Sequence, residues 1–183
     1  KIQTHDALKK VGAIIERPNF YPYMTAEENL KLVCKIKNID YSKINEKLEL
    51  VGLNERKNSK FSTFSLGMKQ RLAIASALLN DPEILILDEP TRGLDYSAKL
   101  RLIKILRSMA EEGRSVVLAT HDVELVAEVA TRVVFLAEGE KIADGSTLEI
   151  LTSSPAFAPQ ISKILAPGKW LTFSEITSAL EQN

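Results

Sequence analysis

The sequence contains a single cysteine, Cys34, among its 183 residues. One cysteine excludes an internal disulfide and any zinc site built from cysteines, which fits a reducing compartment. Lysine plus arginine and aspartate plus glutamate both number 24, so bulk charge gives no reason to expect nucleic acid as a partner. No apolar run approaches the roughly 18 residues of a membrane helix, and the first residues lack the apolar stretch of a signal peptide. We therefore expect a cytosolic protein whose partners must be identified from local sites.

Four consecutive apolar residues, Ile84 to Leu87, are followed by Asp88, Glu89 and Pro90. Such a run predicts a strand that is buried on both faces and carries two carboxylates at its carboxyl end, where open α/β sheets place their chemistry. Burial so close to two acids is unfavourable unless they meet a cation, hydrogen-bond donors or water. The stretch predicts either a metal or nucleotide site or, as the alternative, a core strand followed by an acidic loop.

Two further apolar runs also end in polar residues. The run 11–15 precedes Glu16, and the run 116–120 precedes His121. Helical patterns separate these runs, so the order predicts an α/β fold with a parallel sheet, to which a hairpin over 133–143 adds an edge. A lone histidine is usually structural, but the position of His121 at a strand end, like that of Glu89, favours a functional reading.

Helix starts are marked at two places. Thr25, followed three residues later by Glu28, forms a capping box, and the aromatic loop before it, 19–24, suits either a contact surface or packing under the helix. Ser65 is placed to cap a helix over Met68–Leu79. Gly67 would let a ligand approach the backbone, so this turn is either an anion-binding helix start or a simple N-cap.

The order of these features resembles the ATP-binding domain of ABC transporters over roughly residues 10–150. Ile84–Asp88 is similar to the Walker B strand, with Glu89 at the position of the catalytic glutamate. Gly93–Asp95 resembles the D-loop and His121 the switch histidine, whereas Glu16 stands where the family has the Q-loop glutamine.

Phe64–Met68 is similar to the LSGGQ signature of the same family. Ser65 and Gly67 match it, while Leu66 and Met68 replace its first glycine and its glutamine.

The resemblance implies ATP and Mg²⁺ as ligands of a site shared between two ATPase subunits. Asp88 would hold Mg²⁺, Glu89 would orient the attacking water as general base, and His121 would hydrogen-bond the γ-phosphate. The remaining nucleotide-contacting or coupling positions that it implies are Ser65, Gly67, Asp95 and Glu16. A carboxylate at 16 accepts hydrogen bonds but cannot donate them when ionised, unlike the family glutamine.

The phosphate-binding motif G-x-x-x-x-G-K-[ST] is absent from the printed sequence. We therefore expect an incomplete P-loop NTPase core, the C-terminal portion of such a domain, with part of its central sheet uncovered and no ATP hydrolysis by the chain alone. The expected segments are a core strand with a Q-loop-like segment (1–23), a helical subdomain (24–80), a core with Walker B, D-loop and histidine switch (81–150) and a helical tail (151–183).

The two halves of the chain resemble different branches of the family. Residues 11–95 are most similar to ATPases of peptide-antibiotic export and immunity, and residues 96–183 to those of energy-coupling-factor importers. The function implied is the ATPase subunit of an ABC transporter, at the inner face of the membrane, with a second ATPase subunit and membrane permeases as partners. The alternative is a non-catalytic module that lends its signature motif to a complete partner.

Overall fold

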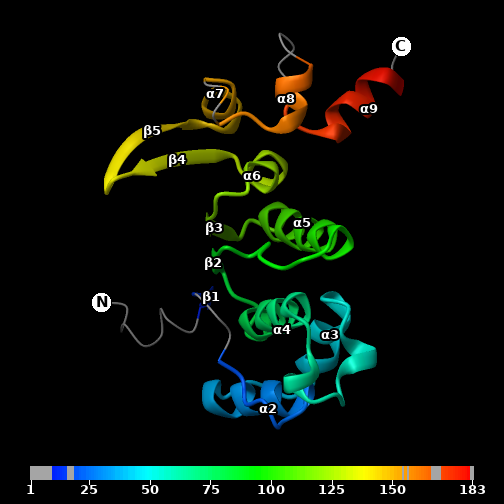
Figure 1. Ribbon diagram of the computed structural model, residues 1–183. Helices are drawn as coiled ribbons and strands as arrows, with labels where there is room; N and C mark the ends of the chain where they lie inside the picture. Colours follow the sequence, from blue (N-terminus) through cyan, green and yellow to red (C-terminus); the bar gives the residue numbers. More distant parts are fainter. Residues whose placement is uncertain (1–9, 16–18, 154, 156, 166–169, 182–183) are drawn as a thin grey trace. The chain divides into compact units, whose positions relative to one another are not determined.

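The computed structural model describes residues 10–15, 19–153, 155, 157–165 and 170–181, which fall into two compact units, Lys1–Ala119 and Thr120–Asn183. Figure 1 shows the order of the elements along the chain. The division into four segments expected from the sequence stays a prediction.

The first unit is built on a three-stranded parallel sheet in the order β1–β2–β3. Its strands are β1 (Val11–Ile14), β2 (Ile84–Asp88) and β3 (Ser115–Ala119). Its helices are α2 (Ala26–Lys37), α3 (Lys43–Leu50), α4 (Leu66–Leu78) and α5 (Tyr96–Glu111), with short 3-10 turns at Asn54–Arg56 and Phe61–Thr63. The predicted parallel sheet is confirmed, and helices α4 and α5 contact β1 and β3 respectively.

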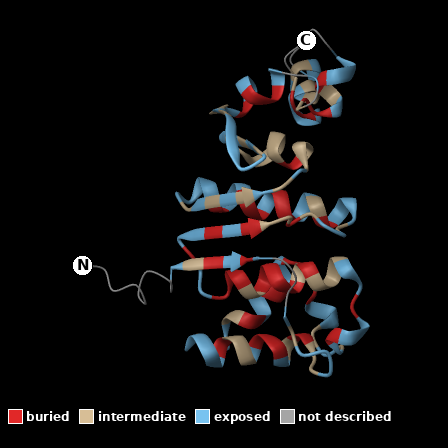
Figure 2. Cartoon of the chain, turned by 60° about the vertical axis from the view of Figure 1, so that its left-hand side comes forward, coloured by how far each residue is buried: buried red, intermediate tan, exposed pale blue. Residues whose placement is uncertain are grey.

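The sheet is buried on one face only. Leu85 and Leu87 have no exposed surface, whereas Ile84 and Ile86, which alternate with them, are 38% and 37% exposed. The register places Ile86 between Ala13 and Val117, and this row is exposed across all three strands. Figure 2 shows this alternation of buried and exposed positions. The prediction of a strand buried on both faces is therefore wrong, because the helices of this unit cover only one side of the sheet. The expected uncovered part of the sheet is the exposed row through Ile86.

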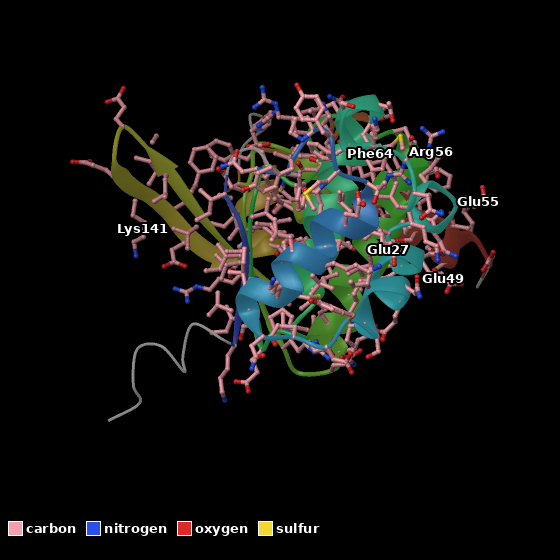
Figure 3. All side chains as sticks on the ribbon, turned by 90° about the horizontal axis from the view of Figure 1, so that it is seen from below. Glu27, Glu49, Glu55, Arg56, Phe64 and Lys141 are labelled. Carbon is pink, nitrogen blue, oxygen red and sulfur yellow. The ribbon has the colours of Figure 1, made fainter. Side chains whose placement is uncertain are left out.

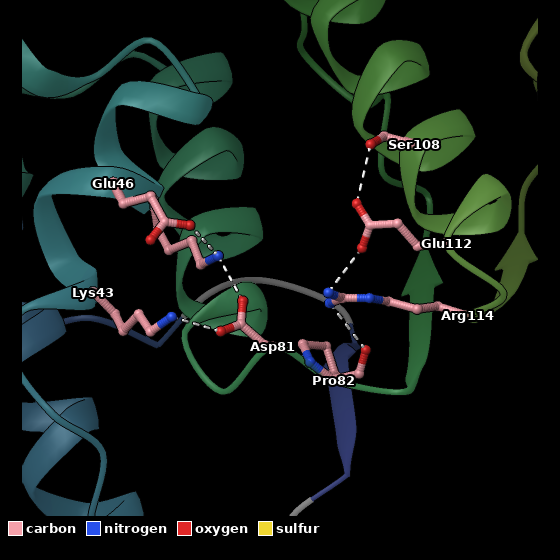
Figure 4. A network of polar contacts seen from close by, with 8 residues as sticks. Lys43, Glu46, Asp81, Pro82, Ser108, Glu112 and Arg114 are labelled. Atoms are coloured by element: carbon pink, nitrogen blue, oxygen red, sulfur yellow. Dashed lines mark hydrogen bonds and ion pairs between the residues drawn. The ribbon is translucent and has the colours of Figure 1, made fainter.

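The helical part of the first unit is held to the sheet by an ion-pair cluster at the turn that leads from α4 into β2. Lys47 on α3 is 6% exposed, and its Nζ lies 2.6 Å from Asp81 and 2.7 Å from Glu46. Asp81 also pairs with Lys43 at 3.0 Å. On the next residue, the carbonyl of Pro82 accepts a 3.5 Å hydrogen bond from Arg114. Figure 4 shows both groups of contacts, which bind the turn to α3 on one side and to the residue before β3 on the other.

The charges of this cluster are mutually stabilised. Burial alone would lower the pKa of Lys47, but its hydrogen bonds to Asp81 and Glu46 raise the pKa overall. Burial alone would raise the pKa of Asp81, and hydrogen bonds from Lys47 and Lys43 lower it overall. Both groups are thus held in their charged forms. Asp81 adopts a φ of 42°, in the left-handed region where aspartate is tolerated better than most residues.

The second unit contains a hairpin and short helices. Its elements are α6 (Val123–Val129), β4 (Arg132–Ala137), β5 (Glu140–Ser146), α7 (Thr147–Thr152), α8 (Gln160–Ile164) and α9 (Phe173–Glu181). The hairpin is confirmed, but it forms a two-stranded sheet of its own, so the prediction that it extends the parallel sheet is wrong for the residues that the structure describes. Across the hairpin Arg132 makes two hydrogen bonds to Asp144, of 2.8 and 2.9 Å, and Lys141 (Figure 3) adds a third at 3.2 Å.

Within the described ranges, no helix has the length and the apolar character needed to cross a membrane.

Candidate functional site

Two successive carboxylates, Asp88 and Glu89, lie at the carboxyl end of β2, as the sequence predicted. The backbone turns immediately after the strand, because Glu89 has a φ of 45° while its N–H still donates to the carbonyl of Ala119 at 2.8 Å. The Glu89 carbonyl in turn accepts from the N–H of Arg92 at 3.1 Å. A left-handed glutamate is unusual and costs about 1 kcal/mol or more. Such strain is typical of functional turns.

The carboxylate of Asp88 fits a metal ligand. The side chain is half-buried, and no described residue donates a hydrogen bond to it or pairs with it. Among the described residues no three His, Cys, Asp or Glu side chains gather into a group that could hold a metal ion alone. A hard cation at Asp88 would therefore take its other oxygen ligands from a nucleotide or from water.

Ser65 caps the N-terminus of α4. Its Oγ accepts a hydrogen bond from the N–H of Met68 at 3.2 Å, which confirms the predicted cap, and the helix begins at Leu66, two residues before the predicted start. Because the hydroxyl accepts this bond, its hydrogen can still be donated to an acceptor. Phe64, the residue before the cap, is labelled in Figure 3; it is buried, and its ring lies 6.0 Å from that of Phe61, which anchors the turn.

The first turn of α4 packs on the turn that follows Glu89. A Cβ added at Gly67 would lie 2.5 Å from the carbonyl oxygen of Gly93, so glycine is required at position 67 whether or not a ligand binds. Two residues further on, Asp95 caps α5, with its Oδ1 accepting from the N–H of Ala98 at 2.8 Å. The structure thus brings Ser65, Gly67 and the turn before Asp95 together in the first unit, which also holds Asp88 and Glu89.

His121 is exposed and belongs to the second unit. It directly precedes Asp122, which caps α6 by accepting from the N–H of Leu125 at 3.0 Å. Glu16 lies outside the described residues.

Two buried polar residues of α2 and α3 were missed from the sequence, Asn29 and Lys47. Asn29 is 1% exposed and fixes the aromatic loop before α2: its Oδ1 accepts from the N–H of Tyr21 at 2.8 Å and its Nδ2 donates to the carbonyls of Tyr21 and Thr25 at 3.1 and 2.9 Å. The loop presents two tyrosines to solvent, Tyr21 at 60% and Tyr23 at 83% exposure. Each missed residue lies within an apolar helical stripe, and a polar residue in such a stripe is the signal that could have found it.

A family model described as ABC transporter matches residues 1–92. An ABC transporter ATP-binding protein of Streptomyces avermitilis, so named in provisional form, is 57% identical over 116 residues, covering 63% of this chain and 21% of that protein. The lantibiotic transport ATP-binding protein SrtF of Streptococcus pyogenes is 41% identical over 143 residues, covering 76% of this chain and 62% of that protein. The chain therefore spans less than two thirds of the length of these relatives.

Solved structures agree with the sequence relatives. The dimeric ATP-binding cassette MJ0796, in a post-hydrolysis state bound to ADP and Pi, superposes with a TM-score of 0.70 at 28% identity, covering 80% of this chain and 68% of that one. The fold is thus that of a P-loop NTPase of the cassette type. On the family match and the shared fold, the chain belongs to the ABC transporter family.

Proposed function

We propose that these residues form part of an ATPase subunit that couples ATP hydrolysis to membrane transport. The observation that carries the proposal is the Asp88–Glu89 turn: two successive half-buried carboxylates at the carboxyl end of β2, the second on a strained backbone. Hydrolysis of ATP needs a metal ligand and a group that orients water, and neighbouring carboxylates can divide these tasks.

Each site residue has a role in this proposal. Asp88 binds Mg²⁺, which when present neutralises charge on the β- and γ-phosphates. Glu89 accepts a proton from the attacking water, and His121 donates a hydrogen bond to the γ-phosphate. Glu16, in place of the family glutamine, can only accept from water or bind the cation when it is ionised.

The turn at Phe64–Met68, called the signature turn below, would contact a nucleotide held by the opposing subunit. The free hydroxyl hydrogen of Ser65 and the unpaired N–H groups at the start of α4 are donors for a phosphate oxygen. A helix terminus contributes only about 0.3–1 kcal/mol to an exposed anion, so these groups assist binding and cannot hold ATP alone. The phosphate-binding loop comes from outside the printed sequence, and Asp95 couples the two halves of the shared site.

Partners follow from the same proposal: a second ATPase subunit, identical or different, and permease subunits that hold the pair at the inner face of the membrane. The aromatic loop around Tyr21 and Tyr23 is a suitable permease contact, because Asn29 fixes its backbone while both rings stay exposed. Rigid tyrosines give a contact surface that loses little entropy on binding.

The test is Glu89→Gln in the complete subunit that carries these residues, assembled with its permease. A general base contributes about 10²–10⁴-fold, so ATP turnover should fall by that factor while ATP binding is retained. The matched control is Glu83→Gln at the other end of β2, where the carboxylate is 66% exposed and pairs with Lys10 at 2.8 Å. Equal turnover in wild type and Glu89→Gln would contradict the role given to Glu89.

A second candidate is a non-catalytic module that supplies its signature turn to a complete partner, which the phosphate donors at Ser65 and the start of α4 would suit. Calorimetry of this chain with Mg²⁺-ATP separates the two. Tight binding by the chain alone would show that the phosphate-binding motif is dispensable. Under the second candidate, ATP binds only when the complete partner is added, and Glu89→Gln leaves the partner's turnover unchanged.

A further inference from the structure

The signature turn and the turn after Glu89 contact each other through glycines and one leucine. The carbonyl of Gly93 lies where a side chain at position 67 would begin, at 2.5 Å from the ideal Cβ. In the reverse direction, a Cβ on Gly93 would lie 2.7 Å from both Cγ and Cδ2 of Leu66. Leu66 therefore covers the Gly93 backbone from the other turn, and the two turns have no room for an added carbon.

Both turns lead directly into a helix through a capping side chain. Ser65 begins α4 and Asp95 begins α5. Gly93 has a φ of 73°, so the chain reaches Asp95 through a left-handed turn that is closed by the 3.0 Å hydrogen bond from the N–H of Leu94 to the carbonyl of Thr91. The position of this turn against α4 thus fixes the distance between the two capping residues.

Leu66 stands where the signature pattern has a glycine. A glycine there would leave the surface of Gly93 uncovered, since the contacts are made by the Cγ and Cδ2 atoms of the leucine. The side chain is 53% exposed, so about half of it is available for this contact and half faces solvent. A leucine in place of the glycine thus adds a contact between residues 66 and 93, which are 27 positions apart in the sequence.

We propose that Leu66 is a positioning residue, which holds the turn 91–95 against the signature turn so that Ser65 and Asp95 keep a fixed separation. The proposal rests on the function proposed above, in which Ser65 contacts the nucleotide of the opposing subunit and Asp95 couples the two sites. Under it, the signature turn and the turn after Glu89 move as one body when the subunits close.

Amide hydrogen exchange of this full chain tests the contact without any nucleotide. Leu66→Ala removes the Cγ and Cδ atoms but favours the helix, because alanine has the highest helix propensity. We expect exchange at residues 92–95 to become about fivefold faster, the factor that corresponds to losing the burial of roughly half a leucine side chain. The matched control is Leu66→Met, which retains length and volume and should keep wild-type exchange.

Two outcomes would overturn the positioning role. Unchanged exchange at 92–95 in Leu66→Ala would show that the leucine does not hold the turn. An equal acceleration at 92–95 and in the β2 amides would show a general loss of stability and no local role.

A double-mutant comparison supplies an independent check. Gly93→Ala is strained in any background by its positive φ, but only with leucine at 66 does the added methyl also meet Cγ and Cδ2. The fall in melting temperature caused by Gly93→Ala should therefore be smaller in Leu66→Ala than in wild type. Additive effects would contradict the contact. Both readouts are independent of ATP, so they can fail while Glu89→Gln succeeds, or succeed while it fails.

Discussion

Replacing Lys47 by methionine tests the cluster that holds α3 to the turn before β2. Methionine keeps most of the length of the side chain and removes the charge, so the change deletes the 2.6 Å pair with Asp81 and the 2.7 Å pair with Glu46 with little change in volume. We expect the free energy of unfolding to fall, because Asp81 is left with Lys43 as its only cation among the residues drawn in Figure 4.

The size of the effect follows from burial. Removing one partner of a fully buried ion pair costs about 3–5 kcal/mol. Here the Lys47 side chain is 8% exposed, but those of Asp81 and Glu46 are 38% and 59% exposed, so water stabilises the remaining acids. Solvent screening and the retained Lys43 pair reduce the expected loss to about 1–2 kcal/mol.

Urea unfolding of this chain, followed by circular dichroism, measures the loss. Lys31→Met is the matched control: it removes a 2.8 Å pair with Glu27 on the surface of α2, where the lysine is 48% exposed, and should cost much less than Lys47→Met. A second variant, Asp81→Asn, tolerates the left-handed backbone and removes the charge from the other side. If Lys47→Met and Lys31→Met had equal unfolding free energies, the stabilising role given to the buried Lys47 ion pairs would be refuted.

Three further predictions concern single contacts. Asn29→Leu leaves the N–H of Tyr21 without its acceptor and should lower the unfolding free energy by about 1–3 kcal/mol, measured by urea titration. Ser65→Ala removes the cap of α4 and should cost about 1 kcal/mol in the same assay. Hydrogen bonds from Arg132 and then Lys141 lower the pKa of Asp144 to about 2, so the contribution of Asp144 to stability is complete above its usual pKa and is lost as the pH falls toward 2. An NMR titration should give that midpoint, and Arg132→Gln should raise it; a midpoint that Arg132→Gln left unchanged would contradict the pair.

Features that depend on neighbouring residues were predictable from the sequence. The capping box forms as expected, with Thr25 Oγ1 accepting from Glu28 N at 3.2 Å and Glu28 Oε2 from Thr25 N at 2.7 Å. The cap at Ser65 and the three strands were likewise expected, because caps and apolar runs are local patterns. On α5 the apolar residues at helical spacing are mostly buried, namely Ile103, Leu106 and Met109, whereas Leu100 is 41% exposed.

Features that depend on distant residues were not predictable. Whether Ile84 and Ile86 are covered depends on which elements reach that face of the sheet, and an apolar run carries no information about them. The burial of Lys47 was missed because its partner Asp81 is 34 positions away in the sequence. The contact between Gly67 and Gly93 was missed for the same reason. From the sequence alone, the glycine at position 67 was explained by the close approach of a ligand.

At position 89 the residue that would be best for stability differs from the residue that the proposed chemistry needs. Glycine or asparagine would adopt a φ of 45° with less strain, so a library selected for thermal stability alone should replace the glutamate by one of these. A library selected for transport should retain it, because only a side chain that accepts a proton can activate water there. The two selections should therefore diverge at position 89 and agree at Pro90, which is buried and carries no charge.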